Sequence, residues 1–345
     1  MIKFIKKNPA IPQRWIVLTA LAYSLTAAQA QTPQAEKAFI KENMEFATKQ
    51  YSLMMQTPAQ GKNGKAIMPH SIRKDGTPSK GSIYLWTAGF FPGTLWYLSN
   101  YTGDKALQDS ALVYTHQMEP AKTFTDNHDI GFMMYCSYGN ANRFAPKDEY
   151  EDILVESARS LCTRFRPQAK VIQSWNGFRS WHGDKVYDFP VIIDNMMNLE
   201  LLFHASKVTG DESFRKVAIS HAEQVMHHQI RKDYSCFHII YYDKKTGKPI
   251  KGETSQGYSD NSAWSRGQAW GIYGFTMCYR ETKDKRFLKT AEKMADFYLD
   301  HPNLPSDKVA WWDFNAFQEG YTPGIRSNAC KMVNNYRDAS AAACV

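Results

Sequence analysis

Residues 199–227 read LELLFHASKVTGDESFRKVAISHAEQVMH, and this stretch decides the fold class. Apolar residues recur at spacings of three and four on both sides of Thr209-Gly210-Asp211, which predicts two amphipathic helices. Thr and Gly can end the first helix, and Asp can cap the second by accepting from its free N–H groups. The stretch therefore predicts a helical hairpin with antiparallel partners.

The same pattern occurs in two other segments. Residues 96–118 contain Thr102-Gly103-Asp104, and residues 275–299 contain Thr282-Lys283-Asp284. Hairpins repeated over about 300 residues predict stacked helix pairs, in an open solenoid or a closed toroid. The three turns are unevenly spaced, so sizeable inserts separate the hairpins. Such inserts favour a closed ring with functional loops.

The composition is that of a globular protein. The 345 residues are 43% hydrophobic and 22% charged, which excludes a disordered chain. The length allows about two domains or one large one. A helix is expected over residues 35–55. Residues 236–242 (CFHIIYY) are the best strand candidate, and we expect that strand to lie in a loop excursion.

The first thirty residues have the pattern of a secretory signal. They carry four basic residues and no acidic one, then an apolar run over 15–25 and the small-x-small site Ala28-Gln29-Ala30. The apolar run is too short to span a bilayer. A retained N-terminal anchor is the alternative. We expect residues 1–30 to be a signal peptide, 31–345 to form a single domain, and the mature chain to be periplasmic or secreted.

The net charge and the cysteine spacing limit the kinds of ligand and cofactor that the chain is expected to bind. The net charge is +8, and residues 1–30 supply +4 of it. The remaining +4 is too mild for a nucleic-acid-binding protein. It suits an anionic substrate, and it is also ordinary for a neutral enzyme. The six cysteines form no C-x-x-C pair, so most are expected to fill the core. No metal-ligand spacing is present, and we expect no cofactor.

Two aspartates interrupt apolar segments of the chain. Asp129 lies in TDNHDIGFMM (125–134), and Asp194 lies in FPVIIDNMMNL (189–199). An aspartate in apolar surroundings is costly unless it is paired or hydrogen-bonded. One interpretation is that each aspartate caps the helix that follows, which fits Asp194 best. The other is that the two are a pair of functional carboxylates.

A polar and aromatic cluster spans residues 255–271, SQGYSDNSAWSRGQAWG. Trp, Arg and Gln at helical spacing can stack on sugar rings and bind hydroxyl groups or a carboxylate. His128 and His238 add possible hydrogen-bond donors, although an isolated histidine is more often structural. The cluster favours a carbohydrate-binding surface.

Several long motifs in order resemble the unsaturated glucuronyl hydrolases, glycoside hydrolase family 88, from about residue 86 to residue 343. The motifs are WTAGFFPGTLW (86–96), HDIGFMMYCSYGN (128–140), FPVIIDNMMNLELL (189–202), SQGYSDNSAWSRGQAWGIYGF (255–275), WWDF (311–314) and RDASAAA (337–343). The resemblance implies an all-α fold, an (α/α)6 toroid of helical hairpins. Family members usually continue beyond RDASAAA, so we expect a catalytic domain that lacks the last C-terminal helices of the ring.

The resemblance also implies the activity and its residues. Asp194 corresponds to the general acid/base and Asp129 to its assisting carboxylate. The expected substrate-binding residues are Trp86, His128, Trp181, His238, Gln256, Arg266 and Trp270. The implied reaction releases a 4,5-unsaturated uronic acid from the anionic oligosaccharides that lyases produce from glycosaminoglycan-type polymers. A polysaccharide lyase on the same toroid and an inactive sugar-binding relative are the alternatives.

Overall fold

The computed structural model describes residues 33–56, 67–180, 182–183, 185–327 and 330–345. The chain divides into two compact units, 1–52 and 53–345. The described part of the first unit belongs to helix α2 (Pro33–Met55), which runs just past the boundary. This helix confirms the one expected over 35–55. The expected signal peptide, residues 1–30, lies outside the described residues and stays a prediction.

Three helical hairpins of the second unit are those predicted from the sequence. They are α3 (Phe90–Thr102) with α4 (Lys105–Gln117), α8 (Asn195–Thr209) with α9 (Glu212–His228), and α10 (Ser265–Thr282) with α11 (Lys285–Leu299). In each turn an aspartate caps the second helix: Asp104, Asp211 and Asp284 each accept a backbone hydrogen bond of 2.8 Å. The predicted hairpins and their capping aspartates are confirmed.

A fourth pair of helical segments was not predicted. Its first half is broken into α5 (Ile130–Met134), a π-helical turn η2 (Tyr135–Gly139) and α6 (Asn140–Phe144), and its second half is α7 (Asp148–Cys162). A short 3-10 helix, η1 (Glu119–Thr123), precedes it. The π-helical turn disturbs the 3.6-residue period, and the connection at 145–147 lacks the Thr-x-Asp pattern. The segment therefore gave no clear hairpin pattern.

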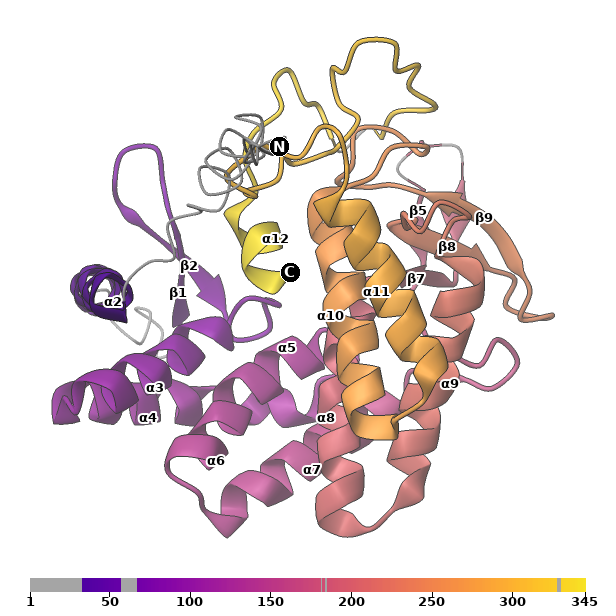
Figure 1. The fold of residues 1–345 in the computed structure, drawn as a ribbon. Coiled ribbons are helices and arrows are strands. Elements are labelled where there is room, and N and C mark those ends of the chain that lie inside the picture. The colour runs from indigo at the N-terminus through magenta and orange to yellow at the C-terminus, as the bar shows by residue number, and fades with distance from the viewer. Residues whose placement is uncertain (1–32, 57–66, 181, 184, 328–329) are drawn as a thin grey trace, which may run out of the picture. The chain divides into compact units, whose positions relative to one another are not determined.

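The helices of the second unit form an inner and an outer set (Figure 1). The first segments of successive hairpins contact one another, because α3 packs on η2 and α6, α5 on α8, and α8 on α10. Helix α12 (Ala339–Cys344) continues this set by packing against α10. Helices α4, α9 and α11 pack on the outside of their partners. The predicted all-α toroid of hairpins is confirmed.

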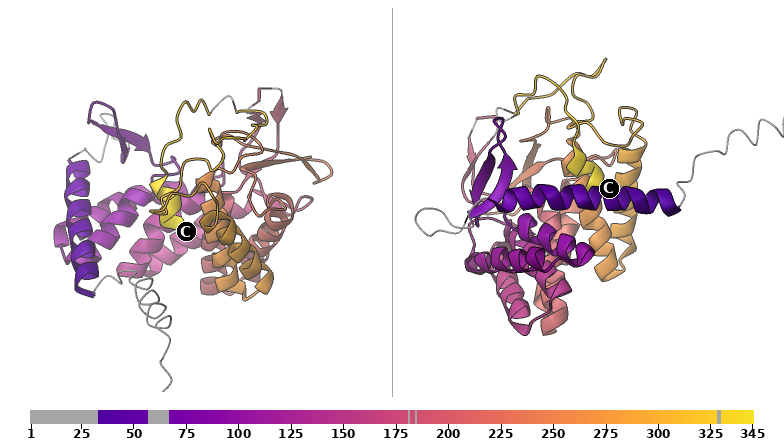
Figure 2. Two further views of the ribbon diagram at one scale, coloured as in Figure 1. Left: turned by 45° about the horizontal axis from the view of Figure 1, so that its top comes forward. Right: turned by 90° about the vertical axis from the view of Figure 1, so that its left-hand side faces the viewer.

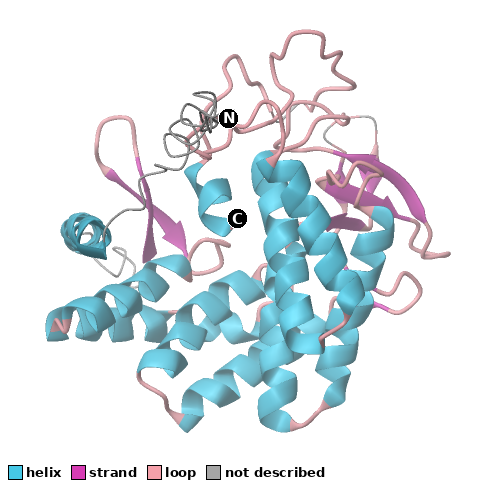
Figure 3. Cartoon of the chain, viewed as in Figure 1, coloured by secondary structure: helices cyan, strands magenta, loops and turns pink. Residues whose placement is uncertain are grey.

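Short strands and long loops lie in two places, with β1 (Ile67–Ile72) and β2 (Pro78–Ser82) before α3 and the other strands near the beginnings of α8 and α10 (Figures 2 and 3). The other strands are β3 (Phe165–Arg166), β4 (Val171–Ile172), β5 (Phe178–Arg179), β6 (Val186–Tyr187), β7 (Pro190–Ile192), β8 (Ile239–Tyr242) and β9 (Pro249–Glu253). Strand β8 is central in the antiparallel sheet β7-β8-β9. The strand expected over 236–242 is thus confirmed for residues 239–242.

Both faces of this sheet are buried, which explains the unbroken apolar run of β8. Ile240 and Tyr242 pack on one face with Val191, while Ile239 and Tyr241 pack on the other. A strand buried on both faces reads as a continuous apolar stretch. Because β7 belongs to this sheet and α8 begins three residues after it ends, the two residues between them, Ile193 and Asp194, have a rigid support on each side.

Two further expectations concern the core and the membrane. All six cysteines are described and unpaired. Cys236, Cys278 and Cys330 are buried, in agreement with a core-filling role, whereas Cys136, Cys162 and Cys344 are only partly buried. Among the described residues, no helix has the length and hydropathy to cross a bilayer.

Candidate active site

Asp194 lies between strand β7 and helix α8. Its backbone is helical (φ −60°, ψ −20°), and its side chain accepts no hydrogen bond from the N–H groups of α8. The interpretation of Asp194 as a helix cap is therefore wrong. The residue is only 7% exposed, and its Oδ1 atom has no hydrogen-bond partner among the described residues. A buried carboxyl oxygen without a partner is available for a reacting group.

The buried position changes the acidity of Asp194. Burial raises the pKa of its carboxyl group from 3.8 to about 7, because the charged form loses its hydration. The negative charge of Asp129 raises this pKa too, whereas the positive charge of Arg266, and that of His128 if it is protonated, would act in the opposite direction. A carboxyl group with a pKa near 7 can donate a proton and take one back at neutral pH.

Asp129 occupies the equivalent position before helix α5. It too is buried and makes no capping hydrogen bond with its helix, so the capping interpretation is wrong here as well. Its Oδ1 atom lies 3.2 Å from Nε2 of the fully buried His128, at ion-pair distance but without hydrogen-bond alignment. His128 and Asp129 therefore lie in the site as neighbours.

Asn198 joins the two segments that carry the aspartates. Its Oδ1 atom accepts a hydrogen bond of 2.7 Å from the backbone N–H of Phe132, in α5. Its Nδ2 atom donates to the backbone oxygen of Asp194, at 3.4 Å. Since Asn198 is fully buried in α8, these bonds hold the beginnings of α5 and α8 against each other. This explains why aspartates 65 positions apart in the sequence share one site.

His238 faces Asp194 from the sheet side. Its Nδ1 atom accepts from the backbone N–H groups of Ser255 (3.1 Å) and Gln256 (3.4 Å), so Nε2 carries the hydrogen. Nε2 lies 3.9 Å from Asp194 Oδ1 and has no hydrogen-bond partner among the described residues. Burial, with the charge of Arg266, lowers the pKa of His238 to about 3. His238 is therefore a neutral donor directed into the site.

Arg266 supplies the positive charge at the beginning of α10. Its Nη2 atom donates to Gln256 Oε1 at 3.3 Å, and its Nη1 atom lies 3.5 Å from Asp338 Oδ2. The guanidinium carbon lies 4.6 Å from the centre of the Trp312 ring and 5.1 Å from that of Trp264. Arg266 is thus fixed by aromatic faces while part of its positive charge remains available to an anion.

Aromatic rings form the remaining wall. The ring centres of Trp86 and Trp270 are 6.1 Å apart in an edge-to-face arrangement, and Phe132 packs against both. Arg266 lies 5.8 Å from the Trp270 ring centre. The two predicted tryptophans therefore lie next to the predicted arginine, although they come from separate segments of the chain.

The structure links eight of the nine predicted site residues through these contacts. Trp181 lies outside the described residues, so its place in the site stays a prediction. Sequence reasoning missed Trp312 and Asp338 as partners of Arg266, although both lie in the WWDF and RDASAAA motifs. It also missed Ser174, a buried partner of His128, and no pattern around Ser174 indicates such a role.

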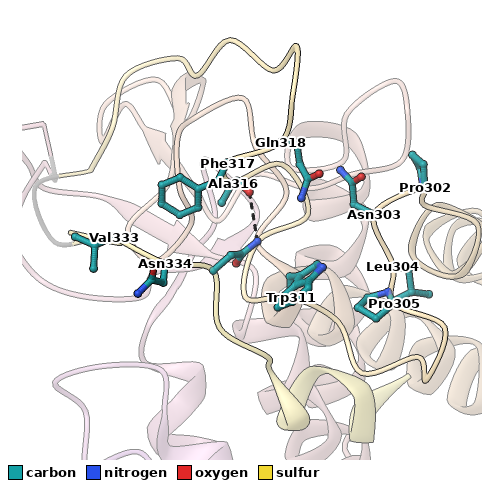
Figure 4. A pocket seen from close by; sticks show the side chains of 11 residues that line it. Pro302, Asn303, Leu304, Pro305, Trp311, Ala316, Phe317, Gln318, Val333 and Asn334 are labelled. Atoms are coloured by element: carbon teal, nitrogen blue, oxygen red, sulfur yellow. Dashed lines mark hydrogen bonds between the residues drawn. The ribbon is translucent and has the colours of Figure 1, made fainter.

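A hollow lined in part by Trp311 of the WWDF segment lies outside this set of residues (Figure 4). This cavity of about 570 Å³ is lined by Trp311, Phe317 and Val333 among others, and by none of the predicted site residues. Trp312, the next residue along, instead contacts Arg266. Within the described ranges, no three His, Cys, Asp or Glu side chains form a potential metal-binding group.

The arrangement defines a class of enzyme. A carboxyl group with a pKa raised by burial, beside a second carboxylate, is typical of the acid/base machinery of glycoside hydrolases. Indole rings and a guanidinium group beside them suit a sugar ring that carries a carboxylate. A buried acid beside a second carboxylate and aromatic rings, on a helical toroid, is therefore the kind of site that glycoside hydrolases have.

Comparison with known proteins specifies the family. Residues 60–281 match the family model Glycosyl Hydrolase Family 88, and the chain belongs to this family. It is 43% identical over 281 residues to the unsaturated glucuronyl hydrolase of Formosa agariphila, an alignment that covers 81% of this chain and 64% of that protein. The resemblance found in the sequence motifs is confirmed.

Solved structures agree with this assignment. A crystal structure of an unsaturated glucuronyl hydrolase specific for heparin is 41% identical and superposes with a TM-score of 0.75, over 81% of this chain and 72% of that one. A variant of the Streptococcus agalactiae unsaturated glucuronyl hydrolase, complexed with dGlcA-GalNAc6S, is 29% identical with a TM-score of 0.64 and covers 88% of this chain and 71% of that one. The chain thus spans roughly two thirds of the length of its relatives.

Proposed function

We propose that this chain is an unsaturated uronyl hydrolase, which removes the 4,5-unsaturated uronic acid from the non-reducing end of oligosaccharides released by polysaccharide lyases. The observation that carries the proposal is the carboxyl group of Asp194, which is buried beside Asp129 with a pKa of about 7. Membership of Glycosyl Hydrolase Family 88 supports it.

The reaction uses Asp194 in two steps. In the unsaturated sugar, the C4=C5 double bond is a vinyl ether conjugated to the carboxylate. Asp194 donates its proton to C4, and positive charge develops at C5 and the ring oxygen. Water adds to C5 and gives a proton to the Asp194 carboxylate, which restores the acid. The hemiketal formed at C5 then opens and releases the next sugar, so no glycosidic carbon is attacked.

The surrounding residues bind and orient the substrate in this proposal. Arg266 offsets the negative charge of the uronate, and the Nε2–H group of His238 donates to a substrate oxygen near Asp194. Trp86 and Trp270 pack against the sugar rings. Asp129 keeps the pKa of Asp194 high through its like charge. The position and charge of each side chain in the described structure support these roles.

The substrate class follows from the same features and from the relatives. One solved relative is specific for heparin, and another holds dGlcA-GalNAc6S. Since an arginine lies beside the acid, we assign to this chain anionic, glycosaminoglycan-type unsaturated oligosaccharides. Export to the periplasm or the medium is part of the proposal, and it rests on the pattern of residues 1–30. Cell fractionation with and without those residues tests the export.

Ultraviolet absorbance of the conjugated double bond tests the activity. The purified chain is mixed with unsaturated chondroitin, hyaluronan or heparin disaccharides, with an Asp194→Asn variant as the control. Falling absorbance with the wild type, and none with the variant, is the expected result. Rising absorbance with an intact polymer would instead identify a lyase. Binding of the disaccharides without any change in absorbance would identify a sugar-binding relative.

A further inference from the structure

Ser174 is a buried serine that connects the two segments bearing the aspartates. Its backbone N–H donates to Pro190 O (2.9 Å), and its backbone oxygen accepts from the N–H of His128 (3.2 Å). Its Oγ atom accepts from the N–H of Ile192 (2.9 Å) and lies 3.3 Å from His128 Nδ1. Two of these bonds go to the strand that leads to Asp194, and two go to the residue before Asp129.

The hydrogen-bond pattern of Ser174 assigns the protons of His128. The backbone N–H of Ile192 can only donate, so it uses a lone pair of Oγ. The buried hydroxyl hydrogen then has an acceptor in His128 Nδ1, at 3.3 Å, when that nitrogen carries no hydrogen, and loses this acceptor when Nδ1 is protonated. A neutral imidazole that accepts at Nδ1 carries its hydrogen on Nε2, the atom 3.2 Å from Asp129 Oδ1.

We propose that Ser174 is a positioning residue, whose hydroxyl group keeps His128 neutral with its hydrogen on Nε2, the ring atom 3.2 Å from Asp129 Oδ1. The proposal rests on the hydrolase function assigned above, since its purpose is to preserve the charge of Asp129. A proton on Nδ1 would point at the hydroxyl hydrogen of Ser174, so this contact opposes the imidazolium form.

The charge of His128 matters because several ionisable groups meet here. Asp129 and Asp194 face it from the beginnings of α5 and α8, and Arg266 and His238 act from the far side of Asp194. From the other elements packed nearby, His221 of α9 interacts electrostatically with His128, and Arg164, after α7, with Asp129. A positive charge on His128 lowers the pKa of Asp194. A neutral His128 therefore helps Asp194 to keep the proton that it must donate.

Kinetics of Ser174→Ala test this role. The variant keeps both backbone bonds and loses both side-chain bonds. We expect kcat to fall about tenfold with KM nearly unchanged. This loss is a fraction of the rate enhancement that a well-positioned general acid provides. The alkaline limb of the pH profile should move to lower pH by roughly one unit, because a charged His128 makes Asp194 a stronger acid. Ser174→Thr, which retains the hydroxyl group, should restore both.

A matched control is Ser157→Ala. Ser157 is equally buried, but its hydroxyl group donates to Ile153 O within α7 (2.7 Å) and contacts no site residue. This variant should leave the pH profile in place. An equal loss of kcat in both serine variants, with no movement of the alkaline limb, would reduce Ser174 to a structural residue and overturn the proposal.

A measurement on the histidines does not depend on turnover. Nitrogen-15 spectra of the 10 histidines, with His128 assigned from a His128→Gln variant, report which ring nitrogen bears hydrogen. In the wild type, His128 Nδ1 should be unprotonated at neutral pH, and in Ser174→Ala it should gain a proton. His221 and His238 accept backbone bonds at Nδ1 and should not change. A protonated His128 Nδ1 in the wild type would overturn the proposal even if the proposed activity holds.

Discussion

Gly131 touches Asn198 so closely that no side chain fits between them. A Cβ atom on Gly131 would lie 2.5 Å from Asn198 Oδ1 and 2.7 Å from Asn198 Cα. Gly131 is two residues after Asp129, and Asn198 is four residues after Asp194. The contact between these two residues therefore sets how closely the helices that follow the aspartates approach, and with it the electrostatic coupling between the two carboxyl groups.

Substitution of Gly131 by alanine tests this contact. The added methyl group collides with the backbone of α8 and must push α5 away, which should lower the free energy of unfolding by about 1–3 kcal/mol. Urea unfolding measures the loss. Gly139→Ala is the control, because its nearest neighbour is a ring carbon of Tyr135 at 3.0 Å, in a side chain that can move. Equal losses in both variants would contradict a special role for Gly131.

Asp194→Asn should abolish turnover while leaving binding almost intact. The amide has nearly the size of the acid but cannot donate a proton to C4, so kcat should fall by roughly 10²-fold to 10⁴-fold. Absorbance assays measure turnover, and calorimetric titration with an unsaturated disaccharide measures binding. Residual activity within a few fold of the wild type would show that Asp194 is not the general acid.

Asp129→Asn should change the pH dependence in a defined direction. The negative charge of Asp129 raises the pKa of Asp194, which burial has already raised to about 7. Without that charge the pKa of Asp194 falls, so the acid loses its proton at a lower pH. The alkaline limb of the pH-rate profile should therefore move to lower pH. A limb that stays in place would show that the two carboxyl groups are not coupled.

The raised pKa of Asp194 should also cost stability at neutral and alkaline pH. In the folded protein the group keeps its proton up to about pH 7, whereas its ordinary pKa is 3.8. Between these values the folded state binds more protons than the unfolded state, so stability falls as pH rises. Asp194→Asn should be more stable than the wild type at pH 8, by up to about 4 kcal/mol, and the difference should vanish near pH 4. Urea unfolding at both pH values measures it.

The capping aspartates should contribute to stability without affecting the site. Asp104 accepts from Ala106 N–H at the beginning of α4. Asp104→Ala should lower the free energy of unfolding by about 1 kcal/mol, the usual cost of a lost cap, and leave kcat unchanged. Asp109→Ala, on the exposed face of the same helix, is the control and should be nearly neutral, because its only side-chain bond in the described structure is to Lys105.

The helical hairpins were predictable because local chemistry determines their turns. Thr-x-Asp ends one helix and caps the next within a few residues, and the structure places Gly103 and Gly210 at positive φ as such a turn requires. The pair of segments α5–α6 and α7 was missed because its first half contains a π-helical turn, which a search for a 3.6-residue period does not detect.

The site was predictable only in part. Long motifs identified Asp129 and Asp194, yet their local sequence favoured capping, and only the three-dimensional packing shows that neither caps a helix. The partners of Arg266 include residue 256, in the loop before α10, and residues 338 and 340, whose proximity depends on how α10 and α12 meet. Ser174 shows the same limit, since its importance lies in bonds to residues 46 and 18 positions away.

The protonation state of His238 controls how the loop before α10 is held. Its Nδ1 atom holds the backbone at Ser255, and its own backbone oxygen accepts from Ile193, the neighbour of Asp194. The hydrogen bond to the loop is lost only when Nδ1 is protonated, because the ring N–H and the backbone N–H of Ser255 are then both donors. Because the pKa of His238 is about 3, this hydrogen bond persists at the neutral pH values at which Asp194 can act as an acid and a base. Protonation of Nδ1 in acid should therefore release this loop, and Gln256 with it.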